Sequence, residues 1–540
     1  MGQFFVAAPA YGAETPPNLH LAYPMLLADA LARYRRVRGD TVLFSAGSNE
    51  SSQQLAAAGA REDLAPLSFA ERLADQHAAV WSGLSVAPDR LVRTSHPVHH
   101  DVVQGMIARL FRMGDVYWGS MRGHFCLSCE VLLDEAEVAD GGRCPNPECG
   151  REVQWIDTQT YLMRTGQYQD RVRDHLRSQP KWIQPADWAE RALQVCATQR
   201  PEPYAARISN WGVLTPPQLP RASGMRVSVW VDVLTNYLTA AWYLQHEDVF
   251  RAHWPPDLQV VTQDLNGEQH LWLYPSLLLS QGVDLPRQMM AVALPGTAGP
   301  DSPNRRTHPL AVAGALSRLA KCEQPLAADA LRWFTLHELC DRGSQGFTMA
   351  SFVTCYNRDL SGRLSRLAYR VMDMLHGIAR GRALPPGAFR PPVDQWISEA
   401  WRRVTGAYDA SSVKEASDAV MELLERLNQH LDQRAPWADR KRKSKTAAIV
   451  ISEVAEALAK ALVMVAPVMP EAAERLGRDL GMVRAPRECG EWWGEVRPCL
   501  VLRGARLRRP ETIYPPVSSQ ARLPSRQEIE VADRVAVAGR

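Results

Sequence analysis

Four cysteines within one short stretch carry the clearest chemical signal in the sequence. They are spaced as Cys126-x2-Cys129 and Cys144-x4-Cys149, with turn-forming glycines and a proline close to the second pair. Two close pairs separated by about 15 residues can place four thiolates at the corners of a tetrahedron around zinc. The spacing predicts a structural zinc knuckle, because four protein ligands leave no open coordination position. Two disulfides or free core thiols are the alternatives.

The elements before these cysteines have the order expected of a parallel α/β sheet. The apolar run 3–10 predicts a buried strand, 21–36 predicts a helix and 41–46 predicts a second strand. Loops at the carboxyl ends of the strands bind ligands in such sheets. We therefore expect a ligand site near the Pro/Gly-rich loop 12–18.

The later segments predict the continuation of the sheet and a helical part after it. Residues 116–215 interrupt the strand–helix alternation and are expected to form an inserted subdomain. Strand patterns return at 226–231 and 258–262, as if the sheet resumes. From about 351 to 480 the pattern is almost purely helical, with leucines at helical spacing. The predicted architecture is thus an α/β part followed by an all-α bundle.

Composition excludes several classes of protein. The 16 Trp, 14 Tyr and 11 Phe residues give a chain of 540 residues ample surface to bury, which excludes disorder throughout. A net charge of +3 neither demands nor excludes a nucleic-acid partner. The most apolar stretch, 447–469, is interrupted by polar and charged residues and predicts a buried helix, so no membrane partner is expected. Ten cysteines are too few for a disulfide scaffold, and a reducing cytoplasm is the expected location.

Phrases spread along the chain resemble the methionyl-tRNA synthetase family of class I aminoacyl-tRNA synthetases. They include MGDVYWG at 113–119 before the cysteines, WIQP at 182–185 beyond them and DALRWF at 329–334. The resemblance runs from Phe4 to about Val517. It implies a class I synthetase Rossmann-like parallel sheet with a zinc-knuckle insertion, followed by an all-α anticodon-binding-like helical bundle.

The resemblance divides the chain into seven segments. Two halves of a Rossmann-like domain flank an inserted connective subdomain, and a loop with a stem-contact-like segment comes after them. The anticodon-binding-like helical domain, a C-terminal extension that packs back and a disordered tail complete the chain. In order, the expected segments are 1–115, 116–215, 216–295, 296–350, 351–485, 486–517 and 518–540, with the halves of the Rossmann-like domain at 1–115 and 216–295.

The ATP signatures of the family are altered in this chain. The family's His-x-Gly-His contacts ATP at the amino end of a helix, where the dipole stabilises phosphate charge. Here the stretch reads Asn18-Leu19-His20-Leu21, so only His20, displaced by one residue, could substitute. The mobile Lys-Met-Ser-Lys-Ser loop has no counterpart in 296–308, where Arg305 and Arg306 either contact phosphate or belong to a solvated basic loop. ATP and Mg²⁺ are expected as cofactors only if these three residues replace the lost motifs.

The amino-acid pocket implied by the resemblance is better preserved. Trp230 resembles the tryptophan that walls the methionine side chain, and Asp264 and His270 resemble two residues that line it. Asn49 stands where an aspartate would hold the substrate ammonium group, and an amide cannot offer the same charge-assisted bond. Gly12 stands where the family often has a tyrosine, which would enlarge the pocket. Without a ligand, Trp230 would be a core residue and Asp264 a helix N-cap.

Two residues of the helical domain resemble the helix pair that reads the anticodon. Trp437 could stack on a splayed base and Asn428 could hydrogen-bond one, which makes tRNA a candidate partner. The alternative is a packed tryptophan on a solvated basic face.

The sequence supports four hypotheses of function. The first is a methionyl-tRNA synthetase-like protein with a degenerate adenylation site, which does not charge tRNA and binds an amino acid, an amino-acid derivative or a partner protein in specialised metabolism or regulation. The second is an active ATP-dependent enzyme that activates or ligates amino acids in a natural-product pathway, for example by N–N bond formation, with His20, Arg305 and Arg306 handling phosphate. The third is a methionine–tRNA ligase, which would need a relocated ATP site. The fourth is a tRNA- or protein-binding module that uses the bundle alone.

Overall fold

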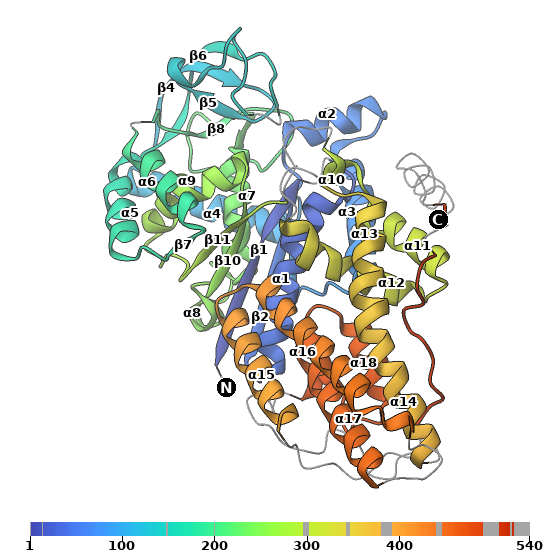
Figure 1. The fold of residues 1–540 in the computed structure, drawn as a ribbon. Helices are drawn as coiled ribbons and strands as arrows, with labels where there is room; N and C mark the ends of the chain where they lie inside the picture. Colours follow the sequence, from blue (N-terminus) through green and yellow to red (C-terminus); the bar gives the residue numbers. More distant parts are fainter. Residues whose placement is uncertain are drawn as a thin grey trace.

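The structure is a computed structural model that describes most of the chain (Figure 1). The expected disordered tail at 518–540 lies outside the described residues except for 518, 521 and 522. Residues 296–301 of the loop at 296–308 and 490–506 of the C-terminal extension also lie outside them. The described residues are 2–12, 15–146, 149–198, 200–294, 302–341, 346–379, 391–438, 445–489, 507–518 and 521–522.

A six-stranded parallel sheet forms the centre of the amino-terminal part, in the order β3-β2-β1-β10-β11-β7. The strands predicted at 3–10, 41–46 and 258–262 are confirmed as β1, β2 and β10. β1 continues through Pro9 because a register shift between Ala7 and Ala10 takes the proline out of regular pairing. The strands are β1 (Gln3–Gly12), β2 (Thr41–Asn49), β3 (Arg90–Arg93), β7 (Ile183–Gln184), β10 (Leu258–Thr262) and β11 (Met289–Val292).

Helices cover both faces of this sheet because successive residues of a buried strand point to opposite sides. Val6 and Ala8 of β1 pack into one core together with α1. Phe5 and Ala7 pack into a second core with α4, α7 and α9. The helices of this part are α1 (Leu19–Val37), α2 (Gln53–Arg61), α3 (Pro66–Gly83), α4 (Pro97–Met113), α7 (Val229–Ala240), α8 (Glu247–His253) and α9 (Leu265–Gln281).

The inserted segment contains a five-stranded antiparallel sheet in the order β5-β4-β6-β8-β9. Its strands are β4 (Val116–Cys126), β5 (Val131–Leu133), β6 (Gln154–Met163), β8 (Tyr204–Ile208) and β9 (Met225–Val227). The same segment carries η1 (Glu135–Glu137), α5 (Gly166–Ser178) and α6 (Ala186–Ala197).

Two expectations about the insertion need correction. The strand expected at 226–231 does not resume the parallel sheet, because β9 pairs with β8 and α7 already begins at Val229. Conversely, β7 lies inside 116–215 yet pairs with β11, so the chain returns briefly to the parallel sheet within the insertion. The buried side chain of Ile183 opposite Met289 explains this return, because it extends the apolar layer of the sheet by one strand.

The carboxyl-terminal part is a helical bundle, as the sequence predicts. Leu360, Leu364, Leu367 and Val371 are buried in one core. Among the described residues, no helix is long and apolar enough to cross a membrane. The elements are α10 (Pro303–Arg306), α11 (Pro309–Ala320), α12 (Gln324–Trp333), the π-helical η2 (Phe334–Glu338), η3 (Leu339–Asp341), α13 (Met349–Cys355), the π-helical η5 (Tyr356–Ser365), α14 (Arg366–Ala379), α15 (Val393–Asp409), α16 (Val413–Arg434), α17 (Lys445–Val465), α18 (Pro470–Asp479) and η7 (Pro486–Glu488).

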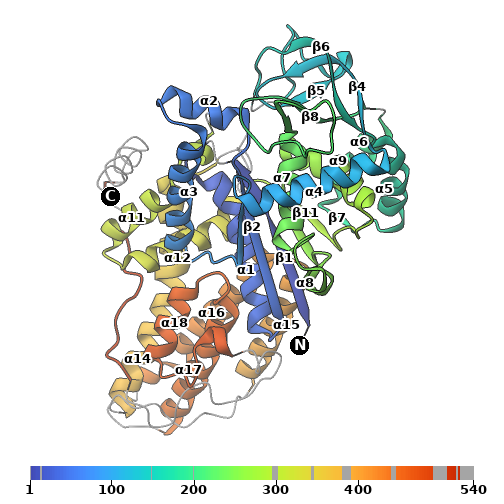
Figure 2. The same ribbon diagram turned by 180° about the vertical axis from the view of Figure 1, so that it is seen from behind.

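The antiparallel sheet and the bundle lie at opposite ends of the molecule, with the parallel sheet between them, as both views show (Figures 1 and 2). The carboxyl ends of the central strands point toward the end that carries the insertion (Figure 1). The insertion is therefore placed to wall any site at that edge of the sheet.

Candidate functional site

Several predicted residues meet at the carboxyl ends of β1, β2 and β10. Gly12 ends β1 and pairs with Asn49, which ends β2. Asp264 lies just after β10 and caps α9, where its Oδ1 accepts a hydrogen bond from the Gly267 amide at 3.1 Å. The structure thus brings Gly12, Asn49 and Asp264 to the edge at which parallel α/β sheets bind ligands.

The first turn of α1 lies at the same edge, and oxygen atoms of the protein accept hydrogen bonds from its backbone amides. Asn18 is the N-cap, and its Oδ1 accepts a hydrogen bond from the Leu21 amide at 3.0 Å. The Leu19 amide donates to the Thr307 carbonyl at 3.1 Å. Amides of a first helical turn are the groups that an anion would otherwise bind. Two of these donors are occupied by protein oxygens.

His20 and Arg305 lie against each other beside this turn. Nη2 of Arg305 donates to Nε2 of His20 at 3.0 Å, and Oδ2 of Asp264 lies 3.9 Å from the same nitrogen. Burial, followed by the charge of Arg305, lowers the pKa of His20 to about 4 against the opposing charge of Asp264. His20 is therefore neutral at pH 7 and accepts through Nε2. Arg306, in the same short helix α10, is exposed.

A buried ion pair that the sequence analysis did not identify holds the end of β2. Glu50 is fully buried and accepts hydrogen bonds from Nε and Nη2 of Arg93 at 2.8 and 3.0 Å. The Ser48 hydroxyl also donates to Glu50, at 2.7 Å. Arg93 ends β3, and neighbouring parallel strands end at a common edge of the sheet. Its place at the end of a strand could therefore have identified Arg93 from the sequence as a residue of this edge. The carboxylate of Glu50 is therefore occupied by hydrogen bonds from within the protein.

Asn49, by contrast, has an unused acceptor. Its Oδ1 is buried and finds no hydrogen-bond partner among the described residues. An unpaired buried carbonyl oxygen is destabilising unless water or a ligand supplies a donor. Gly12, which pairs with Asn49, contributes no side chain that could do so. The edge can therefore accept an N–H group from a bound molecule.

Trp230 and His270 belong to the neighbouring helices α7 and α9. Nε2 of His270 and the hydroxyl of Tyr237 are 2.8 Å apart, and burial raises the pKa of that hydroxyl. Tyr237 is seven residues after Trp230 and so lies on the same side of α7, a helical spacing that could have identified it. His270 is thus held by α7 despite the additional residue between it and Asp264.

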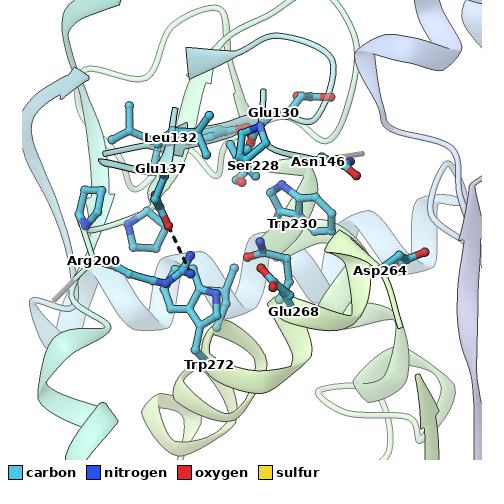
Figure 3. A pocket seen from close by; sticks show the side chains of 18 of the residues that line it. Glu130, Leu132, Glu137, Asn146, Arg200, Ser228, Trp230, Asp264, Glu268 and Trp272 are labelled. Carbon is cyan, nitrogen blue, oxygen red and sulfur yellow. Dashed lines mark hydrogen bonds and ion pairs between the residues drawn. The ribbon is translucent and has the colours of Figure 1, made fainter. Parts of the chain in front are cut away.

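A cavity of about 500 Å³ lies on the knuckle side of Trp230 (Figure 3). Trp230 and Asp264 line it, together with residues of β5, α6 and α9. Gly12, Asn49 and His270 are not among the described residues that line it. The structure therefore divides the residues of the expected amino-acid pocket between this cavity and the sheet edge.

The four cysteines converge beyond the end of β4. The Sγ atoms of Cys126 and Cys149 are 3.6 Å apart, and those of Cys129 and Cys144 are 3.8 Å apart. All four lie within 4.8 Å of one another. A tetrahedral zinc with Zn–S bonds of about 2.3 Å requires sulfur–sulfur distances of about 3.8 Å. The cluster fits a structural zinc site, and the thiols are not joined as disulfides.

The knuckle also contacts the cavity directly. The Nε1 of Trp230 donates to the carbonyl of Cys129 at 3.1 Å. The amide of Asn146, another cavity residue, donates to the Sγ of Cys129 at 3.3 Å. Hydrogen bonds from Cys129 and Cys144 lower the pKa of the Cys126 thiol, whereas hydrogen bonding to Cys126 raises the pKa of those two thiols. The cysteine cluster and the wall of the cavity are thus one connected unit.

In the bundle, the two predicted RNA-reading residues differ in accessibility. Trp437 is 44% exposed, and the guanidinium of Arg370 lies 5.2 Å from its ring centre. Asn428 is buried, and its Nδ2 donates to the carbonyls of Arg363 and Leu424 at 3.2 and 3.1 Å. Its Oδ1 accepts from Nη1 of Arg370 at 3.3 Å. The ring of Trp437 offers a surface for stacking beside a cation, whereas the amide of Asn428 is bonded within the bundle.

Comparison with protein-family models covers both parts of the chain. Residues 4–372 match the family described as tRNA synthetases class I (M). Residues 392–525 match the anticodon binding domain of methionyl tRNA ligase. The first match spans the parallel sheet and the insertion, and the second begins immediately before α15.

Individual proteins agree with these matches. The methionine–tRNA ligase of Thermotoga maritima is 26% identical over 506 residues, which cover 92% of this chain and 78% of that protein. The enzyme of the same name from Mycobacterium tuberculosis is 28% identical over 505 residues, covering 90% and 93%. A crystal structure of M. tuberculosis methionyl-tRNA synthetase bound by methionyl-adenylate superposes with a TM-score of 0.84 at 27% identity, covering 95% of this chain and all of that one. The parallel sheet and the C-terminal helical domain have the fold of that structure.

Proposed function

Because the chain belongs to the methionyl-tRNA synthetase family of class I tRNA synthetases, we propose that it is a member whose adenylation site no longer forms aminoacyl-adenylate. On this proposal it does not charge tRNA. The retained fold binds an amino acid or an amino-acid derivative, or a partner protein, in specialised metabolism or regulation. We expect a cytoplasmic protein with structural zinc and without bound ATP or Mg²⁺.

One observation carries this proposal, namely the closed first turn of α1. An ATP phosphate at this helix end would have to displace the Thr307 carbonyl from the Leu19 amide and the Asn18 side chain from the Leu21 amide. The neutral ring of His20 brings no positive charge to such a phosphate. Each missing donor to a developing charge costs about 3–4 kcal/mol in the transition state, so several losses together would abolish useful activation.

Amino-acid binding is supported by different residues. The unpaired Oδ1 of Asn49 is an acceptor for an ammonium N–H, although without the charge that an aspartate would provide. Trp230 lies within one turn of the start of α7 and presents its ring to the cavity (Figure 3). We propose that these groups, with Gly12, Asp264 and His270, hold the ligand.

A second candidate is an active ATP-dependent amino-acid-ligating enzyme, for example in N–N bond formation. It is favoured by the juxtaposition of Arg305 with His20 at the start of α1, since a guanidinium there could turn toward a phosphate. The relatives named above are methionine–tRNA ligases, and their C-terminal domain makes tRNA a candidate partner of this chain through Trp437. Tight ATP binding separates this candidate from the main proposal.

Calorimetric titration tests the proposed function. The zinc-loaded protein is titrated with Mg-ATP, and separately with methionine and with a panel of amino acids that includes N-hydroxylated ones. We expect no binding of Mg-ATP at millimolar concentration and binding of at least one amino acid that Asn49→Ala weakens. The M. tuberculosis enzyme serves as the positive control for both ligands. Micromolar ATP affinity would contradict the proposal.

A further inference from the structure

The cavity beside Trp230 lies between the knuckle and the helices α6, α7 and α9 (Figure 3). Its volume of about 500 Å³ is in the range of pockets that bury a drug-sized molecule. It shares Asp264 with the edge of the parallel sheet, but the closed start of α1 does not line it. A ligand in this cavity therefore does not need the nucleotide edge, and its binding is independent of the loss of adenylation.

Aromatic rings form much of its wall. Trp230, Trp272 and Tyr204 are each at most 9% exposed, and Trp188 contributes a fourth ring. In Figure 3 the rings of Trp230 and Trp272 stand on different sides of the space. Large aromatic surfaces bury a flat apolar body favourably, because apolar area is removed from water. The cavity thus suits a molecule with an aromatic or otherwise flat apolar part.

The carboxylates of the cavity already have partners. Glu130 accepts from Arg207 at 2.8 Å, and Glu137 is 3.3 Å from Arg200. Glu268 accepts from Nε of Arg191 at 3.0 Å.

Asp264, the fourth carboxylate, caps α9. Four carboxylates and two guanidiniums, those of Arg191 and Arg200, thus line the cavity, and Arg207 pairs with Glu130 from outside the lining. The lining has a negative excess, and both of its guanidiniums already face a carboxylate. A fully charged ligand of either sign would have to compete with these pairs, which favours an uncharged one.

Two donors remain without an acceptor. Nε1 of Trp272 and Nε of Arg200 are both buried and have no hydrogen-bond partner among the described residues. They are neighbours, since the Arg200 guanidinium lies 5.6 Å from the centre of the Trp272 ring. An unpaired buried donor is destabilising, and an oxygen of a bound molecule would supply its missing acceptor. The site therefore calls for a hydrogen-bond acceptor at the Trp272–Arg200 end.

We propose that this cavity is a binding site for an uncharged, amide-class molecule with an aromatic body. The carbonyl oxygen of the ligand accepts from Nε1 of Trp272 and Nε of Arg200. The flat body packs between Trp230 and Trp272, and the amide N–H groups face carboxylate oxygens such as that of Glu137. No bond is made or broken at this site, which recognises its ligand and does not transform it.

Three matched probes that share one aromatic body test the ligand class. They are 3-(naphthalen-2-yl)propanamide, the corresponding propanoate and the corresponding propylamine, each titrated into the full zinc-loaded chain by ligand-observed NMR. We expect the amide to bind at least tenfold more tightly than the amine, which has no acceptor, and more tightly than the propanoate. Tighter binding of either charged probe overturns the proposal, and so does the absence of amide binding.

A tryptophan substitution tests the location. Trp272→Phe removes the N–H group and keeps an aromatic ring, and it is expected to weaken the amide about tenfold. Trp155→Phe, at an exposed position on β6, is the matched control and should leave the affinity unchanged. Equal affinities in Trp272→Phe and the unaltered chain would overturn the proposed site. The ranking of the three probes needs no variant, so it decides the ligand class even if Trp272→Phe does not fold.

Discussion

His20 is the predicted site residue whose charge state the fold changes most directly. Its ring is 7% exposed and shares Nε2 between the guanidinium of Arg305 and the more distant carboxylate of Asp264. A histidine that is neutral in the fold and bonded to a guanidinium is a structural partner, because it offers no cation to a phosphate. The position of the histidine could be predicted from the sequence, but its charge state and its partner, 285 residues away, could not.

The contribution of His20 to the stability of the protein is expected to decrease as the pH falls from about 6.5 to about 4, whereas Asp329, whose pKa burial raises to about 7, acts in the opposite direction. The pKa of His20 is about 4 in the fold and 6.5 in the unfolded chain, so in this window the unfolded chain binds the extra proton. The loss reaches about 3 kcal/mol at the acidic end. Urea denaturation between pH 4 and 7 measures it, and His20→Gln should flatten the dependence.

His77, whose pKa burial also lowers to about 4, remains in that variant and keeps part of the slope. The exposed His246 provides the control, because His246→Gln should show the same dependence of stability on pH as the unaltered chain. Parallel pH profiles of the unaltered chain and His20→Gln would contradict the assignment of a buried neutral ring.

At the scale of elements, the knuckle was the most predictable part of the site and the ends of the strands were the least. The cysteines lie close in sequence, so their spacing alone limits the geometry that they can form. The ion pair of Glu50 with Arg93 and the bond of Leu19 to Thr307 join segments that only the packed sheet and bundle bring together.

The cavity could not be predicted either, because its lining comes from segments that only the packed fold brings together. The apolar run at 226–231 is compatible with pairing in either sheet, and only the packed neighbour β8 places β9 in the antiparallel one.

Loss of the metal is expected to loosen the wall that the knuckle shares with α7. Purified protein should contain about one zinc ion per chain by atomic absorption, and Cys129→Ser should contain almost none, because three thiolates are a poorer site than four. Near-ultraviolet circular dichroism should change as well, since the Cys129 carbonyl holds the indole of Trp230.

Cys196→Ser is the matched control, because Cys196 is buried in α6 and lies outside the cluster. Equal zinc content in Cys129→Ser and Cys196→Ser would show that the cluster does not bind the metal.

At the scale of the whole molecule, a buried arginine joins the sheet to the bundle. Arg332 of α12 donates to Oδ2 of Asp29 in α1 at 2.7 Å, and both side chains are fully buried. It also donates to the carbonyls of Val468, before α18, and of Leu84, after α3, at 2.8 and 3.0 Å. The helix whose first turn is closed is thereby fixed to the C-terminal part of the chain.

Arg332→Leu is expected to destabilise the protein by about 3–5 kcal/mol, because it leaves the carboxylate of Asp29 buried without this partner. Chemical denaturation measures the change. Adding Asp29→Asn to Arg332→Leu should cost less than the sum of the two single changes. Arg403→Leu, which removes an exposed pair with Glu422, is the control and should cost less than about 1 kcal/mol. Additive losses would contradict direct coupling of sheet and bundle through this pair.

We propose that the closed start of α1 no longer supports adenylate formation. Amino-acid-dependent exchange of pyrophosphate into ATP measures that reaction directly, with the zinc-loaded chain, methionine, and a panel that includes N-hydroxylated amino acids. We expect no exchange above the protein-free background with any amino acid, with the M. tuberculosis enzyme and methionine as the positive control. Exchange with a single amino acid would contradict it and would identify an active enzyme in which His20, Arg305 or Arg306 replaces the lost motifs.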